Sequence, residues 1–162
     1  GRLDPAQPQL DNGGARGVPE AEEADLVRAA VLETVPIHEY HHAGRRDHEY
    51  TTRTTPWGRG WTAGGVAFSA IPGGHQSGVP VYEYYHDGRG EHLYSLSAAR
   101  PSQAWSARGS SFRAFAAALN GTAPVLEWYD ARHHERRYGF RAPRPGGGIL
   151  RTRVAFHAFH AR

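Results

Sequence analysis

The chain lacks two residue types that often define a fold or a site. Its 162 residues include no cysteine, which excludes disulfide bonds and thiolate ligands. Methionine is also absent, even at position 1, so we expect a chain that begins after signal-peptide removal or trimming. No stretch approaches the roughly 18 apolar residues of a membrane-spanning helix. The sequence therefore predicts no membrane span.

Lysine is missing as well, so all 19 basic residues are arginines. Together with abundant alanine, glycine and proline, this composition is typical of GC-rich bacterial genomes. The absence of a starting methionine, the many glycine and aromatic residues and the few aliphatic ones favour a secreted protein. Residues 1–34 carry three arginines against seven acidic residues, and the remainder carries sixteen against nine. A basic domain can bind nucleic acid, an anionic cell wall or an acidic protein. Because the arginines are scattered and no nucleic-acid motif accompanies them, we do not expect nucleic acid as the partner.

One interval of 44 residues recurs along the chain without a gap. It separates Pro36 from Pro80, and Pro80 from Pro124. It also relates sets of glutamate, tyrosine and phenylalanine: Glu39, Glu83 and Glu127; Tyr50, Tyr94 and Tyr138; Phe68, Phe112 and Phe156. Such a period indicates a repeat architecture. We therefore expect one domain over residues 35–162, made of repeats at 35–78, 79–122 and 123–162.

Each repeat has the pattern of a β-hairpin followed by a third strand. In the second repeat, residues 81–86 are β-branched and aromatic, residues 87–90 form a turn and residues 91–96 return. Ser97 can cap a short helix over residues 98–107, ahead of the third strand. Three such units predict a mainly β, pseudo-threefold domain of ββ(α)β repeats, either β-trefoil-like or like a small propeller.

The residues before the repeats have a different composition. Residues 1–18 are rich in proline, glycine, asparagine and aspartate, which predicts an extended tail that cannot fold alone. Residues 19–34 are interpreted as a short helix or linker, because Pro19 suits a first helical turn and acidic residues follow it.

Specific residues of the repeats match a known pattern. In the first repeat these are Pro36, Tyr40, Asp47, His48, Tyr50, Thr51, Thr52, Gly60, Trp61, Gly65, Val66, Ala67 and Phe68. In the second they are Pro80, Tyr82, Tyr84, Glu91, His92, Tyr94, Gly109 and Phe112. The third keeps Pro124, Tyr138, Val154, Ala155 and Phe156, with Arg136 in place of the usual histidine.

These residues resemble a family of short repeats found mainly in secreted bacterial proteins, of the type P-x-Y-x-[FY]-Y…D-H-x-Y-T-T…G-W…G-V-A-F. The resemblance covers residues 35–162. It implies an accessory module, often attached to enzymes that act on the cell wall, with no catalytic activity of its own. In overall plan the chain is also similar to the small adaptor subunit of bacterial umbrella toxin particles, which has an N-terminal extension inserted into a lectin-bearing partner.

Acidic residues stand beside basic ones at the start of each returning strand. The pairs are Asp47–His48, Glu91–His92 and Glu135–Arg136. Adjacent strand residues point to opposite faces, so one pair cannot act on one substrate atom. We expect these pairs to make buried hydrogen bonds that pin the hairpin, rather than general acid–base catalysis.

Metal and nucleophile chemistry lack their usual patterns. The eleven histidines include His41–His42 and His133–His134, whose adjacent rings cannot face one ion from a strand. His157 and His160 diverge on a strand in the same way. There is no H-E-x-x-H motif and no G-x-S-x-G elbow. We therefore expect no metal, no cofactor and no catalytic residue.

Aromatic residues offer candidates for both the core and the surface. The recurring Tyr50, Tyr94, Tyr138, Phe68, Phe112 and Phe156 are predicted to build the core of the repeats. Tyr85, Tyr129 and His41 lie on the opposite strand face from the aligned residues Tyr40, Tyr84 and Trp128. Exposed rings of this kind stack on sugars or anchor interfaces. Trp57, which lies in a predicted loop and has no equivalent tryptophan in the other two repeats, is a further surface candidate.

Three functions remain open from the sequence. The first is a secreted, non-catalytic adaptor that binds other proteins through its repeats and through residues 1–18, with Arg2, Leu3 and Leu10 as anchors. It would act within a multi-subunit assembly such as an antibacterial toxin complex. The second is a lectin-like module that binds carbohydrate or cell-wall polymer through Trp57, Tyr85, Tyr129 and His41. The third is an atypical hydrolase, which predicts one asymmetric pocket with a perturbed acid or histidine.

Overall fold

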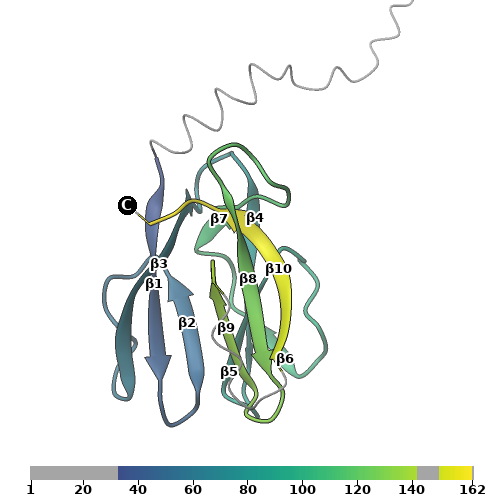
Figure 1. The fold of residues 1–162 in the computed structure, drawn as a ribbon. Helices are drawn as coiled ribbons and strands as arrows, with labels where there is room; N and C mark the ends of the chain where they lie inside the picture. Colours follow the sequence, from purple (N-terminus) through teal and green to yellow (C-terminus); the bar gives the residue numbers. More distant parts are fainter. Residues whose placement is uncertain (1–32, 142–149, 162) are drawn as a thin grey trace, which may run out of the picture.

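The computed structural model describes residues 33–141 and 150–161, in which all regular elements are strands (Figure 1). They are β1 (Val35–His42), β2 (Asp47–Thr51), β3 (Trp61–Pro72), β4 (Val79–His86), β5 (Glu91–Ser95), β6 (Trp105–Ala107), β7 (Phe112–Ala114), β8 (Ala123–Asp130), β9 (Glu135–Gly139) and β10 (Leu150–Ala158). The prediction of a mainly β protein is confirmed. Across these residues no helix is long and apolar enough to cross a membrane.

The helix predicted over residues 98–107 is wrong. Residues 98–104 form bends and turns, and Trp105–Ala107 is strand β6, which pairs with β4. Pro101 has no amide hydrogen to donate and disfavours helical geometry in the residue before it. The residues after Pro101 instead find hydrogen-bond partners along the edge of β4, where Trp105–Ala107 pair with it. The tail 1–18 and residues 19–32 of the expected helix lie outside the described residues.

Three hairpins have the same register, which confirms the predicted strand–turn–strand pattern. β1 pairs with β2, β4 with β5 and β8 with β9, each across five residue pairs and a four-residue turn. The last turn residues are Arg46, Gly90 and His134, 44 residues apart, with φ of 53°, 61° and 50°. This left-handed conformation is easiest for glycine, so the turn geometry is shared even where the residue type is not.

The first strand of each hairpin also pairs with a third strand on its other side. β3 lies beside β1, β10 lies beside β8, and β6 and β7 both lie beside β4. Pairing of β3 with β7 joins the first two hairpins into a seven-stranded sheet, while β8, β9 and β10 form a three-stranded sheet. Both sheets are open. Figure 1 shows the β1–β2 and β8–β9 hairpins side by side with their turns at the same end.

Isolated bridges connect the two sheets. Phe159 pairs with Ser69, and Phe115 pairs with His157. Residues 35–78, 79–122 and 123–162 are hereafter called the first, second and third segments. The two bridges, together with the pair Ile71–Arg113 in the larger sheet, link these segments to one another. Each segment therefore contacts both of the others through its third strand.

The core is built from side chains that recur at the 44-residue interval. One buried cluster contains Ile37, Val81 and Val125; Tyr50, Tyr94 and Tyr138; Phe68, Phe112 and Phe156; and Ala70, Ala114 and Ala158. Each set contributes one residue from every segment. The six recurring tyrosines and phenylalanines are all at most 2% exposed, so the structure places them in the shared centre of the three segments.

Candidate functional site

Three tyrosines at the centre of the fold bind one another in a closed cycle. The amide of Tyr50 donates to the hydroxyl of Tyr94 (2.8 Å), that of Tyr94 to Tyr138 (2.8 Å), and that of Tyr138 to Tyr50 (2.9 Å). The Tyr94 hydroxyl also donates to Glu83 (2.7 Å), and the Tyr138 hydroxyl to Glu127 (2.7 Å). Burial, and secondly the nearby carboxylates, raise the pKa of all three phenols well above 10. The hydroxyls therefore stay protonated and hold the segments together.

The acid–base pairs join different segments rather than pinning their own hairpin. Asp47 accepts from the ring Nδ1 of His92 (2.6 Å) and from the His92 amide (2.9 Å). Glu91 accepts from Arg136 (3.0 Å). The predicted pairing within one hairpin is thus wrong for the acids, because Asp47 and Glu91 each face the base of the next segment along the chain.

The glutamates of the first strands hold the bases from inside each hairpin. Glu127 accepts from Arg136 (2.7 Å) and from Arg153 (3.0 Å). Burial by itself raises the pKa of Glu39, but the hydrogen bond with His48 and the charge of Arg137 outweigh it, and the pKa is lowered. These carboxylates therefore help to hold each hairpin together.

A pocket of about 430 Å³ lies between the first and second segments. Its lining residues are Arg45, Trp57 and Trp61 from the first segment, and Glu83, Tyr85, His92 and Arg108 from the second. The guanidinium of Arg108 lies over the Tyr85 ring, 5.1 Å from its centroid. The rings of Trp61 and His92 make a T-shaped contact with centroids 6.0 Å apart. Aromatic faces beside two guanidinium groups suit a ligand with a flat apolar face and acidic or hydroxyl groups.

Trp57 is the most exposed ring of this pocket, and its position is set by hydrogen bonding. Its side chain is 68% exposed, yet the indole N–H donates to Glu49 Oε1 (3.1 Å). Arg53 forms an ion pair with the same oxygen and lies over the Trp57 ring, 4.6 Å from its centroid. Burial raises the pKa of Glu49, an effect that the charge of Arg53 offsets in part. An exposed ring held this firmly is suited to act as a binding anchor.

Comparison with protein families assigns the larger part of the chain. Residues 36–142 match the family described as a domain of unknown function, DUF5648. The chain belongs to the DUF5648 family. The matched residues extend from β1 to just beyond β9, so they include all three hairpins and both sides of the pocket. No curated protein and no solved structure matches the chain.

The predicted surface residues of this DUF5648 chain are not gathered in one place. Trp57 and Tyr85 line the same pocket. Tyr129 covers Arg136, whose guanidinium lies 4.3 Å from the ring centroid, and its hydroxyl is 3.1 Å from His134 Nδ1. His41 stacks on His48 with ring centroids 4.4 Å apart. The proposed tail anchors Arg2, Leu3 and Leu10 lie outside the described residues.

Four residues of the pocket were missed by sequence reasoning, and one of them, Glu83, was noted only among the recurring glutamates. Trp61 was noted only as part of the repeat pattern, and Arg45 and Arg108 were counted only as scattered charge. The 44-residue interval offered a signal for Trp61, because Trp105 occupies the equivalent position. Nothing in the sequence brings Arg45 and Arg108 together, since they meet only when the first turn lies beside the second segment.

The pocket also bears on the hydrolase hypothesis. His92 lies in it, and although burial lowers the pKa of this histidine, the hydrogen bond and charge of Asp47 outweigh burial and raise it. None of the seven lining residues is a serine, threonine or cysteine that the Asp47–His92 pair could activate. The lining of the pocket therefore offers this pair no side-chain nucleophile.

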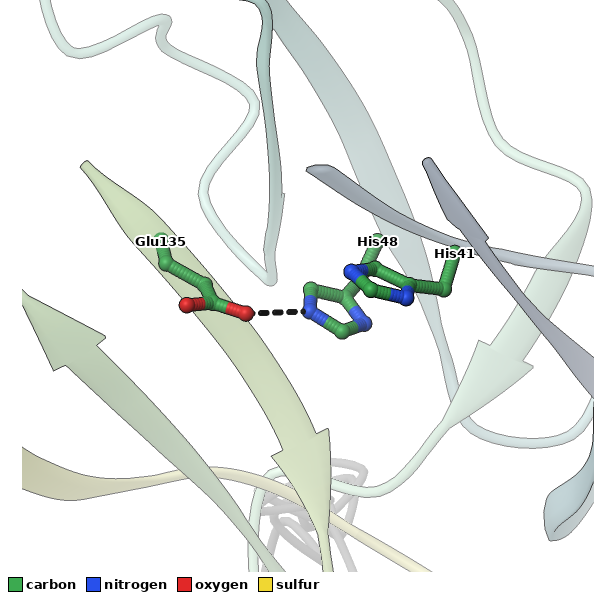
Figure 2. Close-up of side chains that lie close together, drawn as sticks. All are labelled: His41, His48 and Glu135. Atoms are coloured by element: carbon green, nitrogen blue, oxygen red, sulfur yellow. Dashed lines mark hydrogen bonds and ion pairs between the residues drawn. The ribbon is translucent and has the colours of Figure 1, made fainter. Parts of the chain in front are cut away.

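A second cluster of ionisable groups lies where the third segment meets the first. His41, His48 and Glu135 each place one nitrogen or oxygen atom within 4.8 Å of the others. Figure 2 shows the two imidazole rings stacked and the carboxylate directed at the His48 ring. Burial, and secondly the charge of His48, lower the pKa of His41. The prediction considered only neighbours along the chain and did not consider this cross-strand group.

Proposed function

We propose that this protein is a secreted, non-catalytic adaptor that binds other proteins within a multi-subunit assembly, such as an antibacterial toxin complex. In this proposal the three segments are pseudo-threefold repeats that form a rigid body. The cyclic hydrogen bonds of Tyr50, Tyr94 and Tyr138 and the recurring core residues support a threefold arrangement.

The observation that carries the proposal is the pocket between the first two segments. Trp57, Tyr85 and Arg108 are the residue types that most often dominate binding energy at protein interfaces. Arg45 and Arg108 favour a partner that inserts an acidic side chain beside the aromatic rings. The surplus of seven positive charges in residues 35–162, sixteen arginines against nine acidic residues, favours an acidic partner as well.

The N-terminal tail supplies the second contact in this proposal. Residues 1–18 would dock in extended form on another partner, with Arg2, Leu3 and Leu10 as anchors. The adaptor would then hold two proteins, one at its pocket and the other through its tail.

The test is a pull-down of partners from culture supernatant with three forms of the protein. Trp57→Ala is expected to weaken capture of the pocket partner by about 30-fold or more, since truncating an interface anchor costs about 2 kcal/mol or more. Deleting residues 1–18 is expected to remove the other partner only. The exposed Arg59, on the same loop as Trp57, provides the control variant Arg59→Ala, with unchanged capture. Undiminished capture by both altered forms would contradict the adaptor role.

The second candidate is a carbohydrate-binding module, and the same pocket favours it. Aromatic faces of Trp57, Trp61 and Tyr85 can stack on sugar rings, while Glu83 and Arg108 can bind hydroxyl or carboxylate groups. This candidate predicts binding to cell-wall polymer or to a glycan array. Binding would be lost with Trp57→Ala or Tyr85→Ala and unaffected by removal of residues 1–18, which separates it from the adaptor.

A further inference from the structure

The cluster of His41, His48 and Glu135 draws on two distant parts of the chain. His41 in β1 and His48 in β2 are directly opposite each other in the hairpin register, so their side chains share one face. Glu135 begins β9 in the third segment. His48 is 3% exposed, whereas Glu135 is 26% exposed and His41 is half-buried. The group therefore has one buried member and two that border solvent.

His48 lies between two carboxylates. Its Nδ1 is 3.2 Å from Glu39 Oε1, and its Nε2 is 2.9 Å from Glu135 Oε1. A neutral imidazole donates through one nitrogen only, so one of these contacts would set lone pair against lone pair. Either a second proton on the His48 ring or a cation between the ring and a carboxylate removes this lone-pair repulsion. With Nδ1–H donating to Glu39, Nε2 becomes a ligand supported by a carboxylate, which is the usual arrangement of metal-bound histidine.

The other segments show what His41 adds. At the equivalent positions Tyr85 packs on His92, with ring centroids 4.8 Å apart, and Tyr129 covers Arg136. A tyrosine ring therefore covers the base in two segments out of three. Covering the base does not require a ring nitrogen. Among these three equivalent positions in the described part of the chain, that of His41 is the one whose side chain brings a metal-binding nitrogen close to a base and an acid.

We propose that His41, His48 and Glu135 bind a divalent transition-metal ion, with zinc as the best fit. Two imidazole nitrogens and one carboxylate oxygen are a common zinc ligand set, completed by water at the side open to solvent. Zinc needs its ligands at about 2.0–2.2 Å, so the two bordering side chains move inward while His48 stays in place. The bound ion would join β1 and β2 to β9, linking the first segment to the third.

The test is calorimetric titration of ZnCl₂ into the full chain, prepared without a histidine tag. The wild type is expected to bind one equivalent in a saturable step. His41→Tyr, which installs the residue found in the other two segments, and Glu135→Gln, which keeps the contact with His48, should both abolish that step. Glu39→Gln should weaken it by about 10- to 100-fold. His38→Tyr, the same substitution on the same strand but outside the cluster, is the matched control and should bind as the wild type does.

Two results would overturn the site. One is a wild type that takes up no zinc in a saturable one-equivalent step, and the other is His41→Tyr with unchanged zinc affinity. Circular dichroism and thermal unfolding in EDTA check that each variant folds. A variant with wild-type unfolding in EDTA that loses the stabilisation by zinc supports the site independently of calorimetry.

Discussion

The hydroxyl of Tyr94 takes part in two buried hydrogen bonds, as acceptor from the Tyr50 amide and donor to Glu83. The first of these bonds satisfies a main-chain group of another segment. An N–H group buried without a partner costs its full desolvation free energy, which exceeds the net value of one hydrogen bond. At the scale of the residue, one oxygen atom therefore contributes to the contact between two segments.

We expect Tyr94→Phe to lower the free energy of unfolding by about 1–3 kcal/mol, because it leaves the Tyr50 amide unpaired. Urea-induced unfolding measures the difference. Tyr84→Phe is the control, since the Tyr84 hydroxyl donates to the carbonyl of the exposed Ser97 at 2.6 Å, where water can replace it. A loss no larger in Tyr94→Phe than in Tyr84→Phe would show that the tyrosine cycle does not matter for stability.

At the scale of the element, strands β2 and β5 are joined by a charged contact. Asp47 at the start of β2 binds both the ring and the amide of His92 in β5. Three carboxylates act on His92: Asp47 and Glu49 from β2 and Glu83 from β4. Arg45 from the first turn and Arg108 from the residues after β6 line the same pocket as His92. The carboxylates outweigh burial, so the pKa of His92 is raised above 6.5.

This raised pKa predicts a pH-dependent stability. The protonated His92 stabilises the folded state fully below about pH 6.5, and this contribution is lost as pH rises through the raised folded-state pKa. Urea unfolding should therefore show the wild type losing stability relative to His92→Gln as the pH rises above about 6.5. The comparison with His92→Gln removes the opposing contribution of His41, whose pKa is lowered. A difference that is constant with pH would contradict the Asp47–His92 assignment.

At the scale of the whole molecule, buried charges tie the second segment to the third. Arg136 is 12% exposed and contacts both Glu91 and Glu127, which are at most 5% exposed. A buried pair adds little when compared with apolar packing, but losing one member leaves an uncompensated charge. The consequence is that the segments depend on one another for their stability.

Arg136→Met should lower the free energy of unfolding by about 3–5 kcal/mol, since the buried Glu91 loses its hydrogen-bond partner and Glu127 loses one of its partners. The neighbouring Arg137 is a matched control, because its side chain is 44% exposed and makes one 3.4 Å contact with Glu39. Arg137→Met should cost less than about 1 kcal/mol. Thermal and urea unfolding of both variants provide the measurement, and equal losses would argue against a charged contact that holds the segments together.

The sequence by itself determined the hairpins and the core, because both depend on local patterns repeated at one interval. Alternation within residues 81–86 and the turn at 87–90 predict a strand and the strand that returns beside it. A tyrosine equivalent to Tyr94 and a phenylalanine equivalent to Phe112 occupy the same core positions in the other two segments. The helix prediction failed because the pairing of β6 with β4, a contact between separate parts of the chain, outweighed a weak local signal.

Only the tertiary structure decided which charged groups meet. Asp47 and His92 are 45 residues apart, and Glu135 and His48 are 87 apart, so no spacing along the chain predicts these contacts. Arg45 and Arg108 likewise reach one pocket because the first turn lies beside the second segment. A local pattern sets which face of a strand a side chain occupies, whereas the packing of segments sets what that side chain touches.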